Sequence, residues 1–443
     1  MIPSLASIAR NTHHQFNRNF LVHRFGTFNR IMSDITSFGH TPSSQIAARL
    51  DYKVPLSGLF AINKPSGVIS MSLLESLKSL FLTSKLFVKD TNEFKNIIKN
   101  RNFKRKKQHQ ILKIGQGGTL DPLASGVLVI GLNSATKKLS QFLHCTKTYK
   151  TVGLLGCQTD SYDSQGKVVR LANWRHVTDH QIQKSCQSIK GKNRQIPPIY
   201  SALKMDGKPL YEYARENIPL PRPIEARDCE ILDIKMTDWQ EGGTQPQAHS
   251  YKWPSEMCTD QEIEILEKTS KLINSNKAPI SPATDTTSAT KRPAEDSEEE
   301  VNSKKIKITP TDHNLEALSH DLLTTKQPQD IQVSMDDNGL SPAFTIEMTV
   351  SSGTYVRTIV HDIGKAVSSA ATVVSLIRTR QGDFALNPNE GVEPYIGKQP
   401  CIEWQVFEKA IKNQEEGREE SPSEVDGLKE WERQLLQNIK SEF

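Results

Sequence analysis

The sequence is poor in the features that mark metal proteins, disulfide-bonded proteins and membrane proteins. Its six cysteines lie far apart, with no C-x-x-C pair and no histidine at ligand spacing, so neither a zinc site nor a disulfide framework is indicated. No apolar run approaches the roughly 18–20 residues that a membrane-spanning helix needs. Neither G-x-x-x-x-G-K-[ST] nor G-x-G-x-x-G occurs, which leaves a nucleotide-phosphate loop unsupported. We therefore expect an intracellular protein with reduced thiols, no metal and no membrane partner.

The composition indicates that part of the chain does not fold. Hydrophobic residues make up 36% of the 443 residues, and the net charge is +5. This hydrophobic fraction is lower than that of a chain that folds throughout. Residues 241–340 show no helix or strand periodicity and are rich in Ser, Thr, Pro, Lys and acidic runs such as AEDSEEE. This composition predicts a disordered insertion. Residues 391–443 are rich in Glu and Gln and are predicted to form a helical tail.

Two basic segments resemble targeting signals. Residues 1–45 form a basic leader with four arginines and no acid before Asp34, a composition typical of a mitochondrial transit segment. Residues 291–307, KRPAEDSEEEVNSKKIK, have the two basic clusters and spacer of a bipartite nuclear signal. Initiation at Met32 would remove most of the leader. We expect mitochondrial and nuclear location, with the cytoplasm as a further site, against the alternatives of an unstructured leader and a chance charge cluster.

Strand and helix signals alternate irregularly in the remaining chain. GLFAINKPSGVIS, residues 58–70, is a short apolar stretch that runs into a turn, and KTYKTVGLLG alternates like a strand. FTIEMTV also alternates, whereas RTIVHDIGKAV has helical spacing. We predict an α+β (mixed α/β) fold, with a mixed sheet and flanking helices. Residues 46–240 and 341–390 would form one domain interrupted by the insertion.

One loop presents a single acid among small residues. In GQGGTLDPLASG, residues 115–126, Pro122 drives Asp121 into an extended conformation, and the preceding glycines allow a tight turn. A surface turn is the simpler interpretation of an isolated Asp-Pro pair. Nearby, residues 85–113 are strongly basic and contain three phenylalanines, a combination that suits a phosphate backbone with bases to stack.

Four blocks in one order resemble the TruB family of tRNA pseudouridine synthases: GLFAINKPSGVIS, GQGGTLDPLASGVLVIGLNSATK, QIPPIYSALKMDGKPLYEYAR and VSSGTYVRTIVHDIG. The resemblance implies the pseudouridine synthase catalytic fold, with a mixed, largely antiparallel sheet and no added C-terminal RNA-binding domain. It also implies isomerisation of uridine in RNA. That reaction has no net redox change and no hydrolysis, so we expect no cofactor.

The resemblance assigns roles to five residues. Asp121 matches the catalytic carboxylate of the family, and Arg357 matches the arginine that pairs with it. Tyr149 takes the place of the tyrosine that stacks on the flipped base. Tyr355 resembles a second pocket tyrosine, and its position two residues before Arg357 predicts that both lie on one face of a strand. Leu376 fits the leucine of the apolar wall.

Five further residues are expected to bind or position RNA. Lys64, in the KP pair, would support the floor of the site. Gln116 stands where the family usually has a histidine that holds the displaced RNA loop; glutamine can donate a hydrogen bond but cannot become a cation. Lys204, Lys208 and Arg215 lie in the segment that resembles the RNA-binding thumb and would contact phosphates, although solvated charge is an equal alternative.

The substrate implied by the resemblance is tRNA, recognised at its T-loop and T-stem, with the uridine at position 55 as the target. Guide-RNA enzymes of the family carry a further domain, and about 50 residues after Asn389 are too few for one. We expect no guide RNA, and a monomer. The alternatives are a non-catalytic tRNA-binding or folding factor, and a synthase that also acts on mRNA or other RNAs.

Overall fold

The computed structural model describes residues 54–88, 112–216, 218–274, 333–391, 393–418 and 420–441. The leader, most of the basic segment at 85–113 and the clusters at 291–307 lie outside the described residues, so the predictions made for them stay predictions. The chain divides into two units, and the elements that form the sheet belong to the larger one, Lys53–Glu420 with Trp431–Phe443. None of the helices in the described ranges is long and apolar enough to cross a bilayer.

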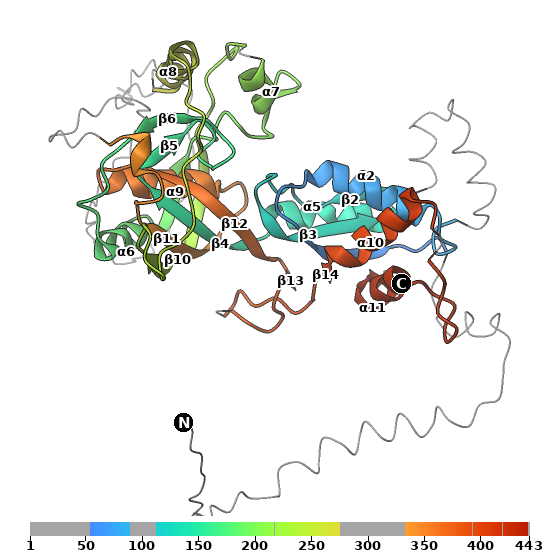
Figure 1. Ribbon diagram of the computed structural model, residues 1–443. Coiled ribbons are helices and arrows are strands. Elements are labelled where there is room, and N and C mark those ends of the chain that lie inside the picture. The colour runs from blue at the N-terminus through green and yellow to red at the C-terminus, as the bar shows by residue number, and fades with distance from the viewer. Residues whose placement is uncertain are drawn as a thin grey trace, which may run out of the picture. The chain divides into compact units, whose positions relative to one another are not determined.

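An eleven-stranded mixed sheet organises this unit (Figure 1). Its main path runs β14-β1-β3-β12-β4-β11-β10-β7, while β13, β15 and β2 pair beside it. Among the described strands of this sheet, only β1 with β14 and β12 with β3 pair in parallel, so the predicted mixed, largely antiparallel sheet is confirmed. The strands are β1 Gly58–Lys64, β2 Ile114–Gln116, β3 Ser125–Leu132, β4 Lys147–Leu155, β7 Gly191–Gln195, β10 Arg227–Gln240, β11 Ala343–Val350, β12 Ala371–Gln381, β13 Phe384–Ala385, β14 Ile402–Glu403 and β15 Lys440–Ser441.

Helices flank the sheet, and short hairpins lie beside it. α9 packs on β12 and β4, α6 packs on β10, and α10 contacts both β1 and α2. Two two-stranded ribbons, β5–β6 and β8–β9, complete the strands. The bounds are α2 Ser70–Phe81, α5 Leu139–His144, α6 Asp179–Ser188, α7 Leu210–Arg215, α8 Asp260–Asn274, α9 Val356–Ala366, α10 Trp404–Glu415, α11 Glu430–Asn438, β5 Cys157–Thr159, β6 Val168–Leu171, β8 Lys204–Met205 and β9 Lys208–Pro209.

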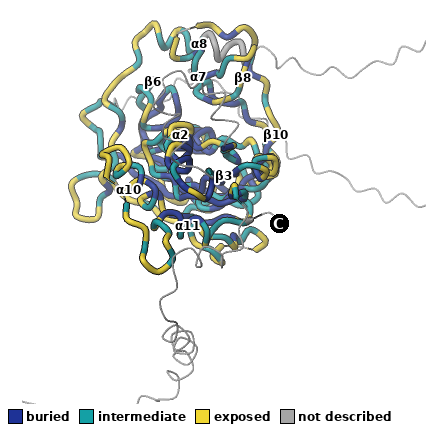
Figure 2. Tube along the Cα trace, turned by 90° about the vertical axis from the view of Figure 1, so that its right-hand side faces the viewer, coloured by how far each residue is buried: buried dark blue, intermediate teal, exposed yellow. Residues whose placement is uncertain are grey.

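The segment predicted as a helical tail also contributes to the sheet and to the core. β14 and β15 both pair with β1, and the Trp431 ring of α11 stacks on Phe81 of α2 with centroids 5.3 Å apart. Trp431 is fully buried. β3, the neighbour of β1, is buried along nearly its whole length (Figure 2). The tail therefore closes the edge of the sheet beside β1 rather than extending away from it.

The structure departs from the expectation that residues 241–340 are disordered throughout. Trp253 is buried, donates its indole N–H to the Leu155 carbonyl at 2.8 Å, and packs edge-on against Trp174. Its backbone N–H donates to Asn338 Oδ1 at 2.6 Å, which ties the beginning of the segment to its end. Buried His249 and the backbone bridge between Met257 and Val168 add further contacts. Averaged composition conceals such local contacts. Residues 275–332 lie outside the described residues.

Candidate active site

The loop that carries Asp121 joins β2 to β3 and is held from several sides. Ser70 Oγ donates to the Leu120 carbonyl at 2.9 Å, and the Gly67 N–H donates to the Pro122 carbonyl at 2.8 Å. Gly126 has a φ of +101°, and a Cβ there would overlap the Arg378 carbonyl oxygen, so only glycine fits. The small residues of the loop thus allow it to press against β12 and the start of α2.

Arg357 forms an ion pair with Asp121. Its Nε lies 3.0 Å from Asp121 Oδ2, and the Arg357 side chain is 5% exposed while that of Asp121 is 42% exposed. The rest of the guanidinium is fixed by Nη1 on the Ser161 carbonyl at 2.6 Å and Nη2 on the Tyr200 carbonyl at 2.9 Å. The pairing predicted from sequence is present. A rigid, buried cation thus holds an accessible carboxylate in place.

Asp163 is the second carboxylate on Arg357, and sequence reasoning missed it. Its Oδ2 lies 3.1 Å from Arg357 Nη1, and its Oδ1 accepts from Ser161 Oγ at 2.8 Å and from the Gln165 N–H at 3.0 Å. Burial raises the pKa of Asp163, and the Arg357 charge opposes that rise. The sequence around it, TDSYDSQG, reads as an ordinary polar turn, so no local signal separates it from a surface acid.

Two further buried cations support the loop from opposite ends. Lys64, at the end of β1, donates Nζ to the Pro65 carbonyl at 2.8 Å and to the Pro122 carbonyl at 3.4 Å. Arg378 of β12, which sequence reasoning also missed, donates to the Val127 carbonyl at 2.7 Å and to the Gly118 carbonyl at 3.0 Å. Burial lowers the pKa of Lys64 to about 8, although the Asp121 charge opposes this shift. Lys64 thus contacts the backbone of the Asp121 loop, and its role in the floor of the site stays a prediction.

Two tyrosines lie in the electric field of Asp121. Tyr149 on β4 is buried opposite Arg378 of β12. Burial is the main cause that raises the pKa of Tyr149 and also that of Tyr355, and the Asp121 charge adds to both rises. Leu376 is buried on β12, two residues from Arg378 and so on the same face of the strand. The two predicted tyrosines thus lie within reach of the Asp121 charge, and Leu376 lies beside Arg378 on β12.

The prediction that Tyr355 and Arg357 share one face of a strand is wrong. β11 ends at Val350, Tyr355 is the N-cap of α9, and Arg357 lies in the first turn of that helix. The Tyr355 N–H donates to Gln195 Oε1 at 2.9 Å. Arg357 therefore reaches Asp121 from the first turn of α9. Side chains in a helix do not alternate between two faces as they do on a strand, so a spacing of two residues does not place Tyr355 and Arg357 on one face.

The remaining predicted residues lie apart from the ion pair. Gln116 donates Nε2 to Thr119 Oγ1 at 3.0 Å. Lys208 pairs with Glu216 at 2.5 Å, Arg215 lies 5.2 Å from the Tyr211 ring, and Lys204 is exposed on β8. The three thumb cations belong to a segment with a small core of its own, formed by Met205, Leu210, Tyr213, Leu220 and Ile224. The contacts described for these cations do not reach Asp121.

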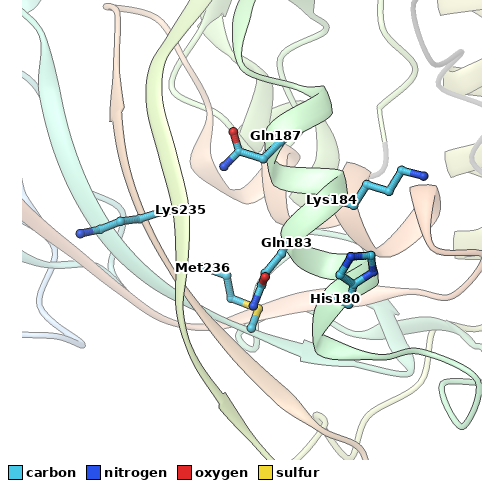
Figure 3. Close-up of a pocket in the computed structure, with 6 residues that line it drawn as sticks. All are labelled: His180, Gln183, Lys184, Gln187, Lys235 and Met236. Carbon is cyan, nitrogen blue, oxygen red and sulfur yellow. The ribbon is translucent and has the colours of Figure 1, made fainter.

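A surface pocket away from Asp121 has no side chains arranged for catalysis. It has a volume of about 420 Å³ and lies between α6 and β10. Lys184 and Lys235 point away from one another in it (Figure 3), so its cations do not converge on one ligand. Among the described residues, no group of three or more His, Cys, Asp and Glu side chains is placed to hold a metal ion. The Asp121 cluster remains the best-supported active site.

A family model and curated relatives both match this chain. The family model "TruB family pseudouridylate synthase (N terminal domain)" matches residues 104–252. The tRNA pseudouridine synthase 4 of Schizosaccharomyces pombe is 38% identical over 349 residues, which span 74% of this chain and 80% of that protein. The protein of the same name from Saccharomyces cerevisiae is 34% identical over 344 residues, or 75% and 79% of the two chains. A solved structure titled "Crystal Structure of a Cbf5-Nop10-Gar1 Complex" has a TM-score of 0.38 at 15% identity, covering 92% of this chain and 65% of that one.

Proposed function

This chain belongs to the TruB family of pseudouridylate synthases, and on that premise we propose that it isomerises the T-loop uridine of tRNA, at position 55, to pseudouridine. The enzyme is then an isomerase that acts on one nucleoside of a folded RNA. The observation that carries the proposal is the 3.0 Å ion pair between buried Arg357 and accessible Asp121. It presents one accessible carboxylate, held by a fixed cation, for this chemistry.

The reaction moves one bond within the nucleoside. The bond from N1 to C1′ breaks, the bond from C5 to C1′ forms, and the proton lost from C5 is balanced by one gained at N1. Asp121 acts on the sugar or the base as nucleophile or base, both of which need the ionised form. Arg357 holds the Asp121 carboxylate in position, and Asp163 contacts Arg357 at a second nitrogen. Atoms and electrons balance without a cofactor.

The walls around Asp121 suit a uridine that has left its stack. Extrusion of a base costs a few kcal/mol, which stacking on an aromatic face offsets. Tyr149 offers that face and Leu376 the apolar wall, and both are buried next to Arg378 on paired strands. The thumb segment would close on the RNA with Lys204, Lys208 and Arg215 toward phosphates. We expect the monomer to act without a guide RNA.

A non-catalytic tRNA-folding factor and a synthase for other RNAs are the competing proposals. The experiment incubates the full chain with a tRNA transcript and with the same transcript carrying cytidine at position 55, then maps pseudouridine. We expect modification of the first transcript alone and none by Asp121→Asn, with tRNA binding kept because phosphate contacts supply most affinity. An active Asn variant would reject the assignment. Mapping tRNA and mRNA from cells with and without the gene tests the substrate range.

The two basic segments support a proposed location in both mitochondria and nucleus. The comparison uses C-terminally tagged forms: the full chain, a chain starting at Met32, and a chain lacking residues 291–307. Mitochondrial signal that persists in the Met32 form would contradict the role of the leader. Nuclear signal unaffected by the deletion would contradict the role of the basic clusters.

A further inference from the structure

Three large apolar side chains are exposed beside the Asp121 loop. Ile69, Met71 and Leu143, here called the rim cluster, are 56%, 55% and 49% exposed. They come from two separate elements: Ile69 is the N-cap of α2, Met71 lies in its first turn, and Leu143 lies in α5. Contiguous exposed apolar side chains mark places where a protein contacts a partner.

The rim cluster is attached to the loop from both sides. Ser70, between Ile69 and Met71, is buried and exchanges hydrogen bonds with the Leu120 backbone at 2.9 and 3.2 Å. Met71 Sδ lies 3.8 Å from Gln116 Nε2. On the other side, Leu143 Cδ2 lies 3.8 Å from the position of a Cβ on Gly118. Met71 and Leu143 therefore meet the loop at Gln116 and Gly118, five and three residues before Asp121, and Ser70 ties the start of α2 to Leu120.

Because the rim cluster lies beside the Asp121 loop, the RNA around the target uridine is the molecule that would cover it. A uridine that enters the pocket leaves a gap in its stack, and the faces of the neighbouring bases lose their contacts. DNA-bending proteins insert Met, Ile, Leu or Phe side chains between base steps in a comparable way. The Gln116 Nε2 is already engaged with Thr119 Oγ1 at 3.0 Å and with the Met71 sulfur at 3.8 Å, which leaves the apolar side chains as the better candidates for this gap.

We propose that the rim cluster packs against the bases on either side of the target uridine and so holds the RNA in its flipped conformation. The inference rests on the proposed function and assigns a positioning role to side chains outside the pocket. Met71 has the central part, because its flexible thioether adapts to irregular apolar surfaces and Gln116 holds it at the edge of the loop. The occupant is RNA, and a second protein or a lipid surface would be different outcomes.

The test replaces Ile69 and Met71 together by serine. Both side chains are exposed, so the fold is expected to persist, which circular dichroism and thermal unfolding would check. Met257→Ser is the matched control, since Met257 is 48% exposed and the loop contacts do not include it. Single-turnover rates are measured on a folded T-arm hairpin and on an unstructured RNA with the same uridine. We expect a loss of about tenfold or more on the hairpin, because unstacking costs a few kcal/mol, and little loss on the unstructured RNA.

A second readout follows flipping directly. With Asp121→Asn as background, 2-aminopurine beside the target uridine should brighten on binding, and less so when the rim cluster is also changed. Equal loss on both RNAs would assign the cluster a structural role and overturn the proposal, as would full activity of the variant on the hairpin, or unchanged fluorescence. Failure of the unmodified enzyme on tRNA would instead reject the proposed function. If the unmodified enzyme ignores unstructured RNA, the fluorescence comparison decides alone.

Discussion

Arg357 and Asp121 form an ion pair in which the cation is buried and the carboxylate is accessible. The guanidinium reaches Asp121, Asp163 and two carbonyls at once, which depends on its planar fork. A lysine has one point charge and cannot reproduce that set. We expect Arg357→Lys to lower the single-turnover rate by about 100-fold or more, since small misplacements in an active site cost that much. Arg194→Lys, at an exposed pair with Asp228, is the control. Near-normal activity of the Arg357→Lys protein would show that charge alone suffices.

The described contacts of Asp163 are with Arg357, Ser161 and Gln165, so we expect its removal to affect turnover more than binding. We expect Asp163→Asn to lower kcat by about 10- to 100-fold with KM nearly unchanged. The free energy of unfolding should fall by up to about 3 kcal/mol, because a buried charge pair is broken, while Asp121 still partners Arg357. Asp228→Asn serves for comparison. A rise in KM without loss of kcat would place Asp163 in substrate binding instead.

Tyr149 is proposed to contribute its ring and not its hydroxyl. Tyr149→Phe keeps the stacking face, and we expect a loss in rate of less than about tenfold, whereas Tyr149→Leu removes the aromatic face and should cost about 1–3 kcal/mol of stacking. Rates on a tRNA transcript under single-turnover conditions compare the two. If the Phe protein were as inactive as Asp121→Asn, the hydroxyl would take part in the chemistry.

Asp362 of α9 should make stability depend on pH. Burial raises its pKa to about 7, with Lys365 opposing the shift, so the folded state holds a proton that the unfolded chain releases near pH 4. Its contribution is present in full below pH 4 and is lost as the pH rises toward and through 7. We expect Asp362→Asn to gain stability relative to the parent as pH rises from 4.5 to 7.5, measured by urea unfolding. Parallel stability curves would contradict this.

Trp253 should anchor the polar segment that follows β10. We expect Trp253→Ala to lower the free energy of unfolding by about 3–5 kcal/mol, as for other large-to-small core changes, because it also leaves the Leu155 carbonyl without its donor. Trp239→Ala, at a half-buried ring that donates to Glu241, should cost less than half as much. If both substitutions lowered the free energy of unfolding equally, Trp253 would contribute no more to stability than the half-buried Trp239.

The sequence predicts best where function is concentrated in a contiguous motif. Asp121 and its glycines form one such block, and the arginine block supplies the partner that the structure places 3.0 Å away. Asp163 and Arg378 could not be predicted from the sequence. Asp163 contacts a residue 194 positions away along the chain and Arg378 one that is 260 positions away, and no local pattern encodes such contacts. The strand prediction for Tyr355 is wrong because alternation over a few residues does not distinguish a strand end from the first residues of a helix.

The pairing of β1 with β14 and β15 has a consequence for how the enzyme is made. Lys64 is set at the end of a strand whose outer edge is closed by residues synthesised more than 300 positions later, with Asn63 bonded to Glu403 at 3.0 Å. While the ribosome is still translating the middle of the chain, that edge has unpaired backbone groups and invites wrong pairing. A nascent chain that stops short of residue 402 therefore leaves this side of the active site unfinished and prone to aggregate.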